Sequence, residues 1–390
     1  MMKKTPLLII LLSVFGLLMS CQQPSVPTTK SGLRPTDFDT IIDQKPVRLY
    51  TLTNQQGMEV CITNYGGRIV SIMVPDRQGS LQDVVLGYDH ICRYADIEGS
   101  PSDFGAAIGR YANRINQGHI TVGDSTIQLP QNNYGHCLHG GPTGWQYQVY
   151  DAQQKDSTTL VLTMHSPDGD NQFPGNVTAT VTYTLTPENE IDIRYEATTD
   201  QLTVINMTNH SYFNLNGDPS QPATNMVLYI NADNFTPTDT TYMPTGEVRP
   251  VEGTPMDFRQ PTALSERIPQ TDYNQIKHAG QGLDHNWCLN TYSDGKGDDT
   301  QVAASLFSPK TGILLEVLTD EPGIQVYSGN FLGTSSVAGK HGIVYPKQAA
   351  VCLETQHYPD SPNHPEWASP WLRPSDTYKS HCTYRFSVIE

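Results

Sequence analysis

Apolar and polar residues alternate along much of this chain. In VTATVTYTL, residues 177–185, apolar side chains occupy every second position and threonines fill the positions between them. After the turn-forming residues PENE, the segment IDIRYEA, residues 191–197, repeats the alternation with Ile191, Ile193 and Tyr195. Successive side chains of a strand point to opposite faces, so the pattern predicts an antiparallel hairpin with one buried and one wet face.

The same period recurs in MEVCITN, STTLVLTMH, GILLEVLTD and GIQVYSGNFL, each bounded by Gly, Pro, Asn or Asp. From Thr36 onward no segment carries a helical apolar stripe longer than two or three turns, and βαβ spacing is absent. The chain is therefore predicted to be all-β, a large antiparallel β-sandwich of two stacked sheets with a concave side that could hold a ligand.

The first twenty-one residues, MMKKTPLLIILLSVFGLLMSC, have a different pattern. Two lysines precede an apolar stretch that ends in Ser20 and Cys21, which is the arrangement of an export signal and too short for a membrane span. Leu18 to Cys21 resembles the lipobox of bacterial lipoproteins, which implies lipidation of Cys21; a plain secretory signal cleaved nearby is the alternative. We therefore expect an exported protein, lipid-anchored to the bacterial envelope on its periplasmic or outer surface.

Domain boundaries follow from the same reading. Residues 1–21 are predicted to be the signal peptide, residues 22–35 a flexible polar tether, and residues 36–390 one domain. The formal net charge of −16 argues against binding to nucleic acid or to anionic membrane surfaces and favours a neutral substrate. Six cysteines besides Cys21 are scattered without C-x-x-C spacing, so we expect buried thiols rather than a zinc site, although an exported protein could oxidise a pair.

Polar groups gather in VINMTNHSYFNL, residues 204–215. Three asparagines, His210 and Tyr212 offer far more hydrogen-bonding capacity than a core strand needs. A lone histidine is more often a satisfied core residue, but these neighbours favour a binding or catalytic site. His210 is therefore a candidate functional residue.

Two further segments carry basic groups. GRYANRINQG, residues 109–118, places Arg110 and Arg114 around Asn113, where a guanidinium fork could hold hydroxyl pairs; for Arg110 we prefer a structural role. NNYGHCLHGG, residues 132–141, sets His136 and His139 before two glycines. On an extended segment the two rings point to different sides and no third ligand is near, so a metal site is not expected.

Carboxylates stand in two apolar runs. GLDHNWCLN, residues 282–290, contains Asp284, which could accept two sugar hydroxyls or close a turn. AVCLETQHYPD, residues 350–360, contains Glu354 among small and β-branched neighbours. Alternation places Glu354 and Gln356 on one face of the strand, so both are predicted to point into the same cavity.

These segments together resemble a known family. The chain is similar to the aldose 1-epimerases, or galactose mutarotases, from about Gln55 to its C-terminus. Eight motifs in the family's order carry the resemblance: GRYANRI, CLHGG, SPDGDNQFPGN, TNHSYFNL, PTGEVRPVEGTPMDFR, GLDHNWCL, PGIQVYSGNFL and CLETQHYPDSPNHP. The resemblance implies a β-sandwich with an open sugar groove and interconversion of the α and β anomers of free aldoses such as galactose and glucose.

The resemblance also assigns roles. Opening a hemiacetal ring needs an acid for the ring oxygen and a base for the C1 hydroxyl. By resemblance Glu354 is the general base and His210 the general acid. Free histidine and glutamate have pKa values of about 6.5 and about 4.3, so one can be protonated while the other is ionised. The substrate-binding positions it implies are Asn113, Arg114, His139 and Asp284, and Gln356 is a further candidate.

Several alternatives stay open. A non-catalytic sugar-binding protein would lack Glu354 or His210, whereas an inverting glycoside hydrolase would use two carboxylates, here Asp284 with Glu354. No cofactor is required; a bound calcium ion is implied by resemblance only, and the Asp-rich loop 292–300 is no EF-hand. The expected partner is a free monosaccharide and the expected state a monomer, with the preferred sugar in doubt because Gly135-His136-Cys137 departs from the family pattern.

Overall fold

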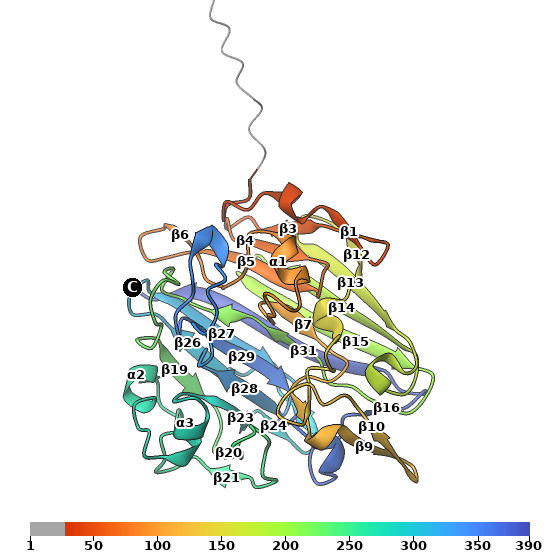
Figure 1. Ribbon diagram of the computed structural model, residues 1–390. Coiled ribbons are helices and arrows are strands. Elements are labelled where there is room, and N and C mark those ends of the chain that lie inside the picture. The colour runs from red at the N-terminus through yellow and green to blue at the C-terminus, as the bar shows by residue number, and fades with distance from the viewer. Residues whose placement is uncertain (1–27) are drawn as a thin grey trace, which may run out of the picture.

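The computed structural model describes residues 28–390, and strands dominate them. All strand pairs within the three largest sheets are antiparallel, as predicted. The largest sheet has nine strands (Figure 1). In spatial order they are β12 (Asp151–Gln154), β13 (Thr159–Ser166), β14 (Val177–Leu185), β15 (Glu190–Thr199), β31 (Tyr378–Val388), β27 (Ile313–Thr319), β26 (Ala304–Phe307), β19 (Val227–Ile230) and β22 (Thr262–Ala263).

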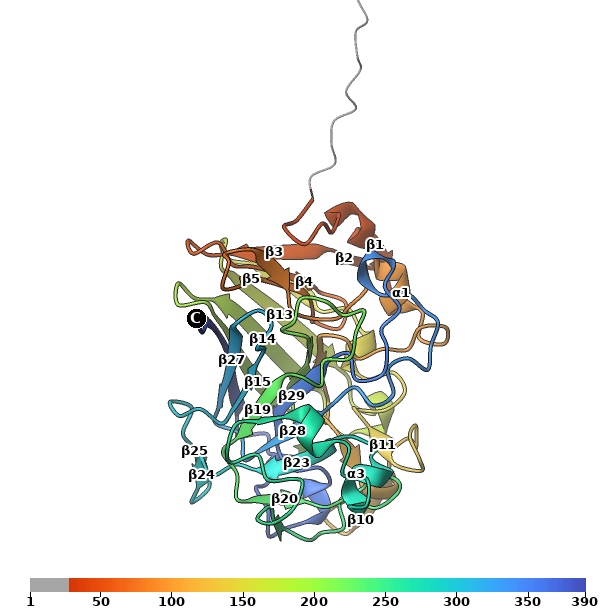
Figure 2. The same cartoon turned by 90° about the vertical axis from the view of Figure 1, so that its left-hand side faces the viewer.

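A six-stranded sheet lies against the nine-stranded one, and Figure 2 shows the two as separate layers. Its order is β18 (Tyr212–Phe213), β29 (Val351–Gln356), β28 (Gly323–Tyr327), β23 (Asp284–Cys288), β20 (Asn234–Thr236) and β21 (Arg249–Pro250). Side chains of both sheets, such as Ile193 and Leu353, share one continuous hydrophobic core. The β-sandwich architecture expected from the alternation is confirmed.

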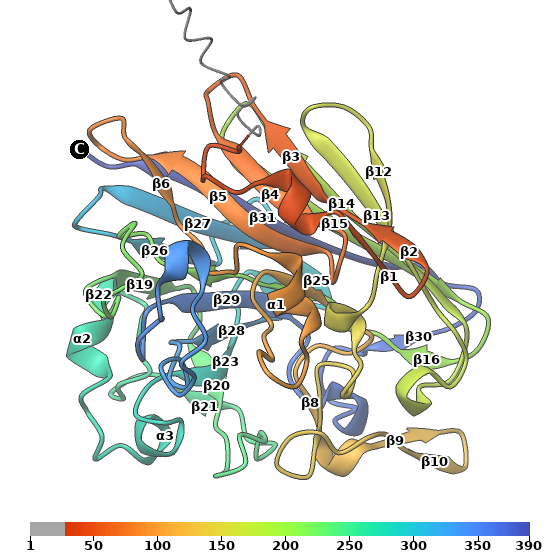
Figure 3. The same ribbon diagram turned by 45° about the horizontal axis from the view of Figure 1, so that its top comes forward.

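A third, four-stranded sheet covers one end of the stack (Figure 3). It contains β3 (Leu49–Thr53), β4 (Glu59–Thr63), β5 (Arg68–Pro75) and β6 (Leu81–Asp83). Every residue of β4 is buried, because Val60 and Ile62 face the main core while Cys61 faces a second core with Leu33 and Phe38. Because β4 is covered on both faces, its odd-numbered and even-numbered residues are both buried.

The predicted hairpin is present. β14 and β15 pair from Val177↔Thr199 to Leu185↔Ile191, and buried residues alternate with more exposed ones along both strands. Short two-stranded pairings complete the fold. They join β1 (Thr40–Ile42) to β2 (Lys45–Val47), β7 (Ala106–Ile108) to β17 (Thr208–His210), β8 (Arg114–Ile115) to β11 (Cys137–Leu138), β9 (His119–Val122) to β10 (Ser125–Gln128), β16 (Thr203–Val204) to β30 (Trp371–Leu372), and β24 (Tyr292–Ser293) to β25 (Lys296–Gly297).

Helices are short throughout residues 28–390, as the missing helical period predicted. The α-helices are α1 (Ile91–Ala95), α2 (Leu264–Arg267) and α3 (Asn274–His278). Single 3-10 turns occupy η1 (Pro35–Phe38), η2 (Asn116–Gly118), η3 (Trp145–Tyr147), η4 (Asp170–Gln172), η5 (Lys340–Gly342) and η6 (Ser361–Asn363). Within the described part of the chain, none of the helices has the length and apolar character needed to cross a membrane.

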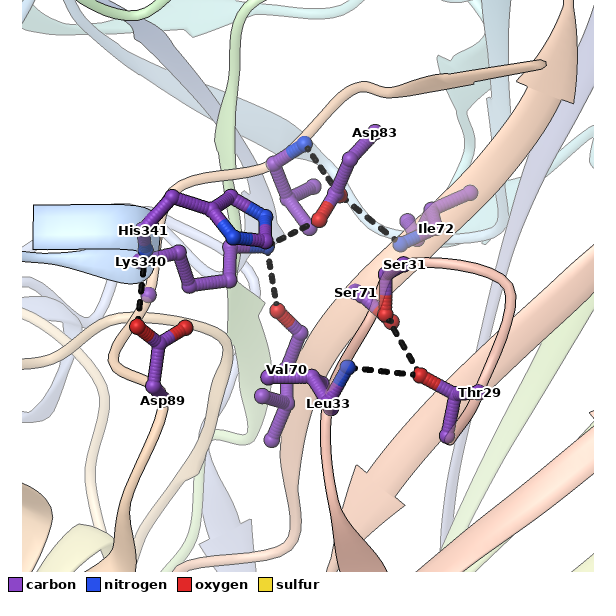
Figure 4. A network of polar contacts seen from close by, with 12 residues as sticks. Thr29, Ser31, Leu33, Val70, Ser71, Ile72, Asp83, Asp89, Lys340 and His341 are labelled. Carbon is purple, nitrogen blue, oxygen red and sulfur yellow. Dashed lines mark hydrogen bonds and ion pairs between the residues drawn. The ribbon is translucent and has the colours of Figure 1, made fainter. Parts of the chain in front are cut away.

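The N-terminal predictions have two outcomes. The signal peptide and the lipobox at Cys21 lie outside the described residues. The tether predicted for residues 22–35 is wrong from Thr29 onward, because Leu33 is only 2% exposed and belongs to the second core. The Lys30 backbone N–H donates to Glu59 Oε1 (2.6 Å), and Ser31 Oγ donates to Ser71 Oγ (3.1 Å; Figure 4). The polar composition of the segment concealed these bonds.

A buried ion pair fastens the loop that follows β28. Lys340 is 4% exposed, and its Nζ donates to Asp83 Oδ2 (2.6 Å) and to the Val70 carbonyl (2.7 Å; Figure 4). The pair joins residues far apart in sequence, and so holds the segment between Phe331 and β29 against β5. Five of the six cysteines in the described chain are buried, as predicted, whereas Cys92 is exposed.

Candidate active site

A polar cavity of about 310 Å³ opens over the six-stranded sheet. Its floor comes from strand residues of β17, β18, β23, β28 and β29, and its walls come from the loops before β7, around β8 and β11, and after β28. The lining residues are Asp103, Asn113, Arg114, Asn133, Tyr134, Leu138, His139, His210, Tyr212, Tyr242, Asp284, Gln325, Tyr327, Phe331 and Glu354. Six of the seven residues predicted for catalysis and binding therefore lie in one cavity.

His210 and Glu354 face each other across the cavity floor. The distance from His210 Nε2 to Glu354 Oε1 is 3.5 Å, and the residues are 5% and 1% exposed. β29 supplies Glu354 opposite Gln325 of β28, whereas His210 ends β17, which pairs with β7. Tyr212 stacks on the His210 ring at a centroid distance of 5.0 Å and fixes its plane. An imidazole and a carboxylate from distant segments thus meet in a water-poor site.

Burial controls the protonation of this pair. It raises the pKa of Glu354 well above its usual value, and the neighbouring Asp284 and Asp103 add to the rise. Burial also lowers the pKa of His210, against the opposing pull of Asp103. Both shifts oppose complete ionisation, so the pair holds a single proton over a broad range around neutrality.

His139 is held as a neutral hydrogen-bond donor. The ring atom Nδ1 of His139 accepts the Asn113 backbone N–H (3.1 Å), and the backbone N–H of His139 donates to the Asn113 carbonyl (3.1 Å). Burial lowers the pKa of His139 to about 3, so the ring is neutral and the proton resides on Nε2. Asn113 and His139 have left-handed φ angles of 64° and 51°, strain that this reciprocal pair of bonds stabilises. The Nε2–H group remains available to a ligand.

Arg114 and Asp284 form the polar wall. Arg114 donates to Asn133 Oδ1 (2.9 Å), and its guanidinium carbon lies 5.2 Å from the centroid of the Tyr242 ring. Asp284 Oδ1 accepts a hydrogen bond from Gln325 Nε2 (2.7 Å). Burial raises the pKa of the Asp284 carboxyl, and the Arg114 charge acts in the opposite direction. This wall offers donors and acceptors at fixed positions, as a sugar with several hydroxyls requires.

Gln356 is the predicted site residue that lies elsewhere. It is fully buried outside the cavity, and neither amide atom has a hydrogen-bond partner among residues 28–390. The His357 N–H donates to Asn206 Oδ1 (3.0 Å) and Tyr111 Oη donates to the Tyr358 carbonyl (3.3 Å), so the segments around Asn206 and Tyr111 cover this end of β29. Alternation located its face correctly, but other segments close the cavity before it.

The other polar candidates have structural roles. Arg110 is 1% exposed and donates to Ser166 Oγ and to the carbonyls of Pro174 and Gly175, which fixes the loop before β14. His136 is bonded to the Gln117 N–H and to Thr241 Oγ1. Neither side chain lines the cavity, which agrees with the structural role preferred for Arg110.

Several residues that line the cavity were not predicted from the sequence. Gln325 and Tyr327 occupy the polar-facing positions of GIQVY, and a glutamine in an apolar strand was a usable signal. Tyr242 and Phe331 lie in loops whose sequence carries no such signal. Asp103 precedes β7 in SPSDFGAA, and nothing in its neighbourhood marks it as functional.

Two groups of side chains have the composition of metal ligands. They are Asp103, His139 and His210, and His210, Cys352 and Glu354. His139 already uses Nδ1 as an acceptor, so its Nε2 carries a proton and is a poor metal ligand. Both groups contain nitrogen or sulfur donors and neither is the oxygen-only set that calcium prefers. The described residues therefore do not fit a calcium ion, and loop 292–300 gathers no such group.

Comparison with known proteins decides the family. Residues 48–385 match the family model described as aldose 1-epimerase. The chain belongs to the aldose 1-epimerase family. As an epimerase, it is an enzyme of the isomerase type and functions as a mutarotase.

Individual relatives are similar in sequence to this epimerase over most of its length. Galactose mutarotase of Mus musculus is 39% identical over 364 residues, which cover 93% of this chain and 99% of the mouse protein. Aldose 1-epimerase of Escherichia coli K12 is 38% identical over 347 residues, covering 88% and 96% of the two chains. The crystal structure of a GalM/aldose epimerase homologue from C. elegans superposes with a TM-score of 0.79 at 29% identity, covering 88% of this chain and 99% of the other.

Proposed function

We propose that this protein interconverts the α and β anomers of free aldohexoses such as galactose and glucose, with Glu354 as general base and His210 as general acid. The observation that supports this most directly is the 3.5 Å approach of the two side chains inside one buried cavity. The C1 hydroxyl oxygen and the ring oxygen of a pyranose are bonded to the same carbon. A base for one and an acid for the other must therefore lie side by side.

The reaction needs two proton transfers and one bond cleavage. Glu354 takes the proton of the C1 hydroxyl while His210 delivers a proton to the ring oxygen, and the bond between C1 and the ring oxygen breaks to leave an open-chain aldehyde. Rotation about the C1–C2 bond presents the other aldehyde face. Ring closure then reverses both transfers and restores the protonation of the pair. Each transfer typically contributes about 10²- to 10⁴-fold in rate.

The single proton of the pair suits this sequence. With the proton on Glu354 both groups are neutral; with it on His210 they form an ion pair that is ready to act. A sugar bound between them supplies hydroxyl groups that replace lost water contacts. Glu354 Oε2 has no hydrogen-bond partner within residues 28–390, so one carboxylate oxygen is free to receive the C1 hydroxyl.

The wall residues would orient the sugar. Arg114 and Asn113 supply donors, Asp284 accepts, and the Nε2–H of His139 donates. Tyr212 lines the cavity and offers an aromatic face to sugar C–H groups. The mechanism assigns no step to a metal ion or other cofactor.

Polarimetry of freshly dissolved α-galactose tests the activity. We expect the enzyme to speed the approach to the equilibrium rotation while no covalent bond to an aglycone is broken. Release of reducing ends from a glycoside would instead support a hydrolase, which would act through Asp284 and Glu354. A protein that binds galactose without changing either signal would be a binding module.

We also propose that a lipid on Cys21 anchors the enzyme, as a monomer, at the bacterial envelope. The support is the lipobox-like run that ends at Cys21 and the acidic composition, which offers no electrostatic route to anionic lipid. Metabolic labelling with a radioactive fatty acid should mark the wild-type chain and leave Cys21→Ala unlabelled. A labelled Cys21→Ala chain would contradict the anchor, and gel filtration would test the monomer.

A further inference from the structure

Asp103 places a third carboxylate in the cavity that Glu354 and Asp284 also line. Its Oδ1 atom is buried and has no hydrogen-bond partner in the described part of the chain. A buried carboxylate oxygen without a donor is costly, and such a group is commonly satisfied by a ligand. The mechanism above gives Asp103 no role.

The backbone holds Asp103 firmly beside His210. The Gly105 N–H donates to the His210 carbonyl (3.0 Å), and the Ala106 N–H closes a turn on the Asp103 carbonyl (3.0 Å). Gly105 has a φ of +67°, and a Cβ there would lie 1.9 Å from the Ile69 carbonyl oxygen, so the turn requires glycine. Phe104 packs its ring against Tyr212 (4.8 Å), leaving Asp103 to face the cavity.

Asp103 and His139 are close enough for one hydroxyl group to bridge them. A carboxylate oxygen of Asp103 and a ring nitrogen each of His139 and His210 lie within 4.8 Å of one another, and neither Asp103 Oδ1 nor His210 Nδ1 has a hydrogen-bond partner within residues 28–390. Two hydrogen bonds of about 2.8 Å meeting at a tetrahedral oxygen separate their outer atoms by roughly 4.6 Å. A sugar hydroxyl could thus accept from His139 Nε2–H and donate to Asp103.

The geometry of a pyranose indicates which hydroxyl this is. In the proposed function, on which this step rests, His210 contacts the ring oxygen and Glu354 the C1 hydroxyl. The other neighbour of the ring oxygen is C5, which bears the C6 hydroxyl. Asp103 groups with His210 and His139, whereas Glu354 groups with His210 and Cys352. A sugar with its ring oxygen at His210 and its C1 hydroxyl at Glu354 would therefore have C5 and C6 nearest Asp103.

We propose that Asp103, together with His139, binds the C6 hydroxyl and selects aldohexoses that carry it. Pentoses and 6-deoxy sugars leave the carboxylate unsatisfied. Uronates and 6-phosphates place an anion against it, which the site rejects because like charges repel in a low-dielectric cavity. The favoured substrate class is therefore the neutral aldohexose with a free C6 hydroxyl.

A cycle of two enzymes and two sugars tests the proposal. We would measure kcat/KM by polarimetry for wild type, Asp103→Asn and Asp103→Ala with galactose and with 6-deoxygalactose. Because hydrogen bonds to charged groups are the strong ones, Asp103→Ala should lose about 10- to 100-fold with galactose and much less with 6-deoxygalactose. Asp103→Asn should also gain activity on galacturonate relative to galactose. The exposed Asp124→Asn, with the same change in net charge, should alter neither ratio.

Equal losses on galactose and 6-deoxygalactose would overturn the proposal, because Asp103 would then act through His210 or through the fold. Asp103→Asn keeps the shape of the side chain, so it serves if the alanine variant does not fold. A wild-type protein inactive on both sugars would contradict the proposed function instead. In that case calorimetry of the same two sugars still tests the role of Asp103. The wild-type protein should bind 6-deoxygalactose more weakly than galactose, and the Asp103→Ala variant should bind the two sugars equally.

Discussion

Replacing Glu354 by glutamine should separate activity from stability. The substitution keeps the shape of the side chain and removes its ability to take a proton. If Glu354 is the general base, turnover of α-galactose should fall by about 10²- to 10⁴-fold. That factor corresponds to roughly 2.7 to 5.4 kcal/mol of transition-state stabilisation.

The same change should leave the fold at least as stable. Burial raises the pKa of Glu354 in the folded protein above its usual value of 4.5. A carboxyl group with a raised folded pKa adds most to stability below pH 4.5, and that contribution is lost as the pH rises through the folded value. At neutral pH the ionisable group therefore costs stability, and a neutral glutamine removes the cost.

Glu321 provides a matched control. It is 3% exposed and pairs with His357 (2.7 Å), so it repeats the buried glutamate–histidine pair outside the cavity. Glu321→Gln should lower stability and leave kcat nearly unchanged, the opposite of Glu354→Gln. Polarimetry gives kcat and KM, calorimetry gives galactose binding, and urea titration gives the free energy of unfolding. A Glu354→Gln enzyme within a few-fold of wild-type kcat would refute the base assignment.

The protonation of the two buried glutamate–histidine pairs and the docking of residues 29–34 can also be measured. The pH profile of kcat should be a broad bell. Its acid limb should lie below pH 6.5 because burial lowers the pKa of His210, and its alkaline limb should lie far above pH 4.5 because burial raises the pKa of Glu354. A rate that rises steadily from pH 5 to 9 would contradict the shared proton. Burial alone would lower the pKa of His357 and raise that of Glu321, but the attraction between the two groups outweighs burial, so the His357 pKa is raised and the Glu321 pKa is lowered. The stability lost in Glu321→Gln should therefore be largest between about pH 4.5 and 6.5, and it should shrink as the pH falls through the Glu321 pKa or rises through the His357 pKa. Urea titrations across pH would show a constant difference if the pair were not coupled. Leu33→Ala should cost about 2 kcal/mol of unfolding free energy, because Leu33 is 2% exposed, whereas Ile41→Ala, at a site 73% exposed, should cost little; equal effects would show that residues 29–34 do not dock as described.

Local pattern was informative where one rule dominated. The hairpin of β14 and β15 followed from alternation alone, because both strands have one buried and one wet face. Glu354 was identifiable for a related reason, since a carboxylate in an apolar strand requires either a polar partner or a functional role. His210 was identifiable because its polar neighbours exceed what a core strand can satisfy.

Long-range packing was out of reach. Alternation placed Gln356 on the face of Glu354, but it could not reveal that the segments around Asn206 and Tyr111 cover that end of β29. The docking of Leu33 depends on a second core contributed by residues up to Ala350 and Cys352. Asp103 gained its position from the pairing of β7 with β17, about a hundred residues away, which no local signal encodes.

The cavity joins two demands that act against each other. Three carboxylates, one guanidinium and two histidines are crowded over the six-stranded sheet, and burial shifts the pKa of His210, Glu354, Asp284 and His139 toward the neutral form of each. Stability alone would favour apolar residues here, because buried ionisable groups without full pairing are costly. The rigid frame bears this cost: β17 pairs with β7, β29 is bonded on both sides to β18 and β28, and Asn113 and His139 hold each other in place. A frame that keeps an acid and a base 3.5 Å apart before substrate arrives need not reorganise during the reaction, which is the condition under which buried proton transfer is fast.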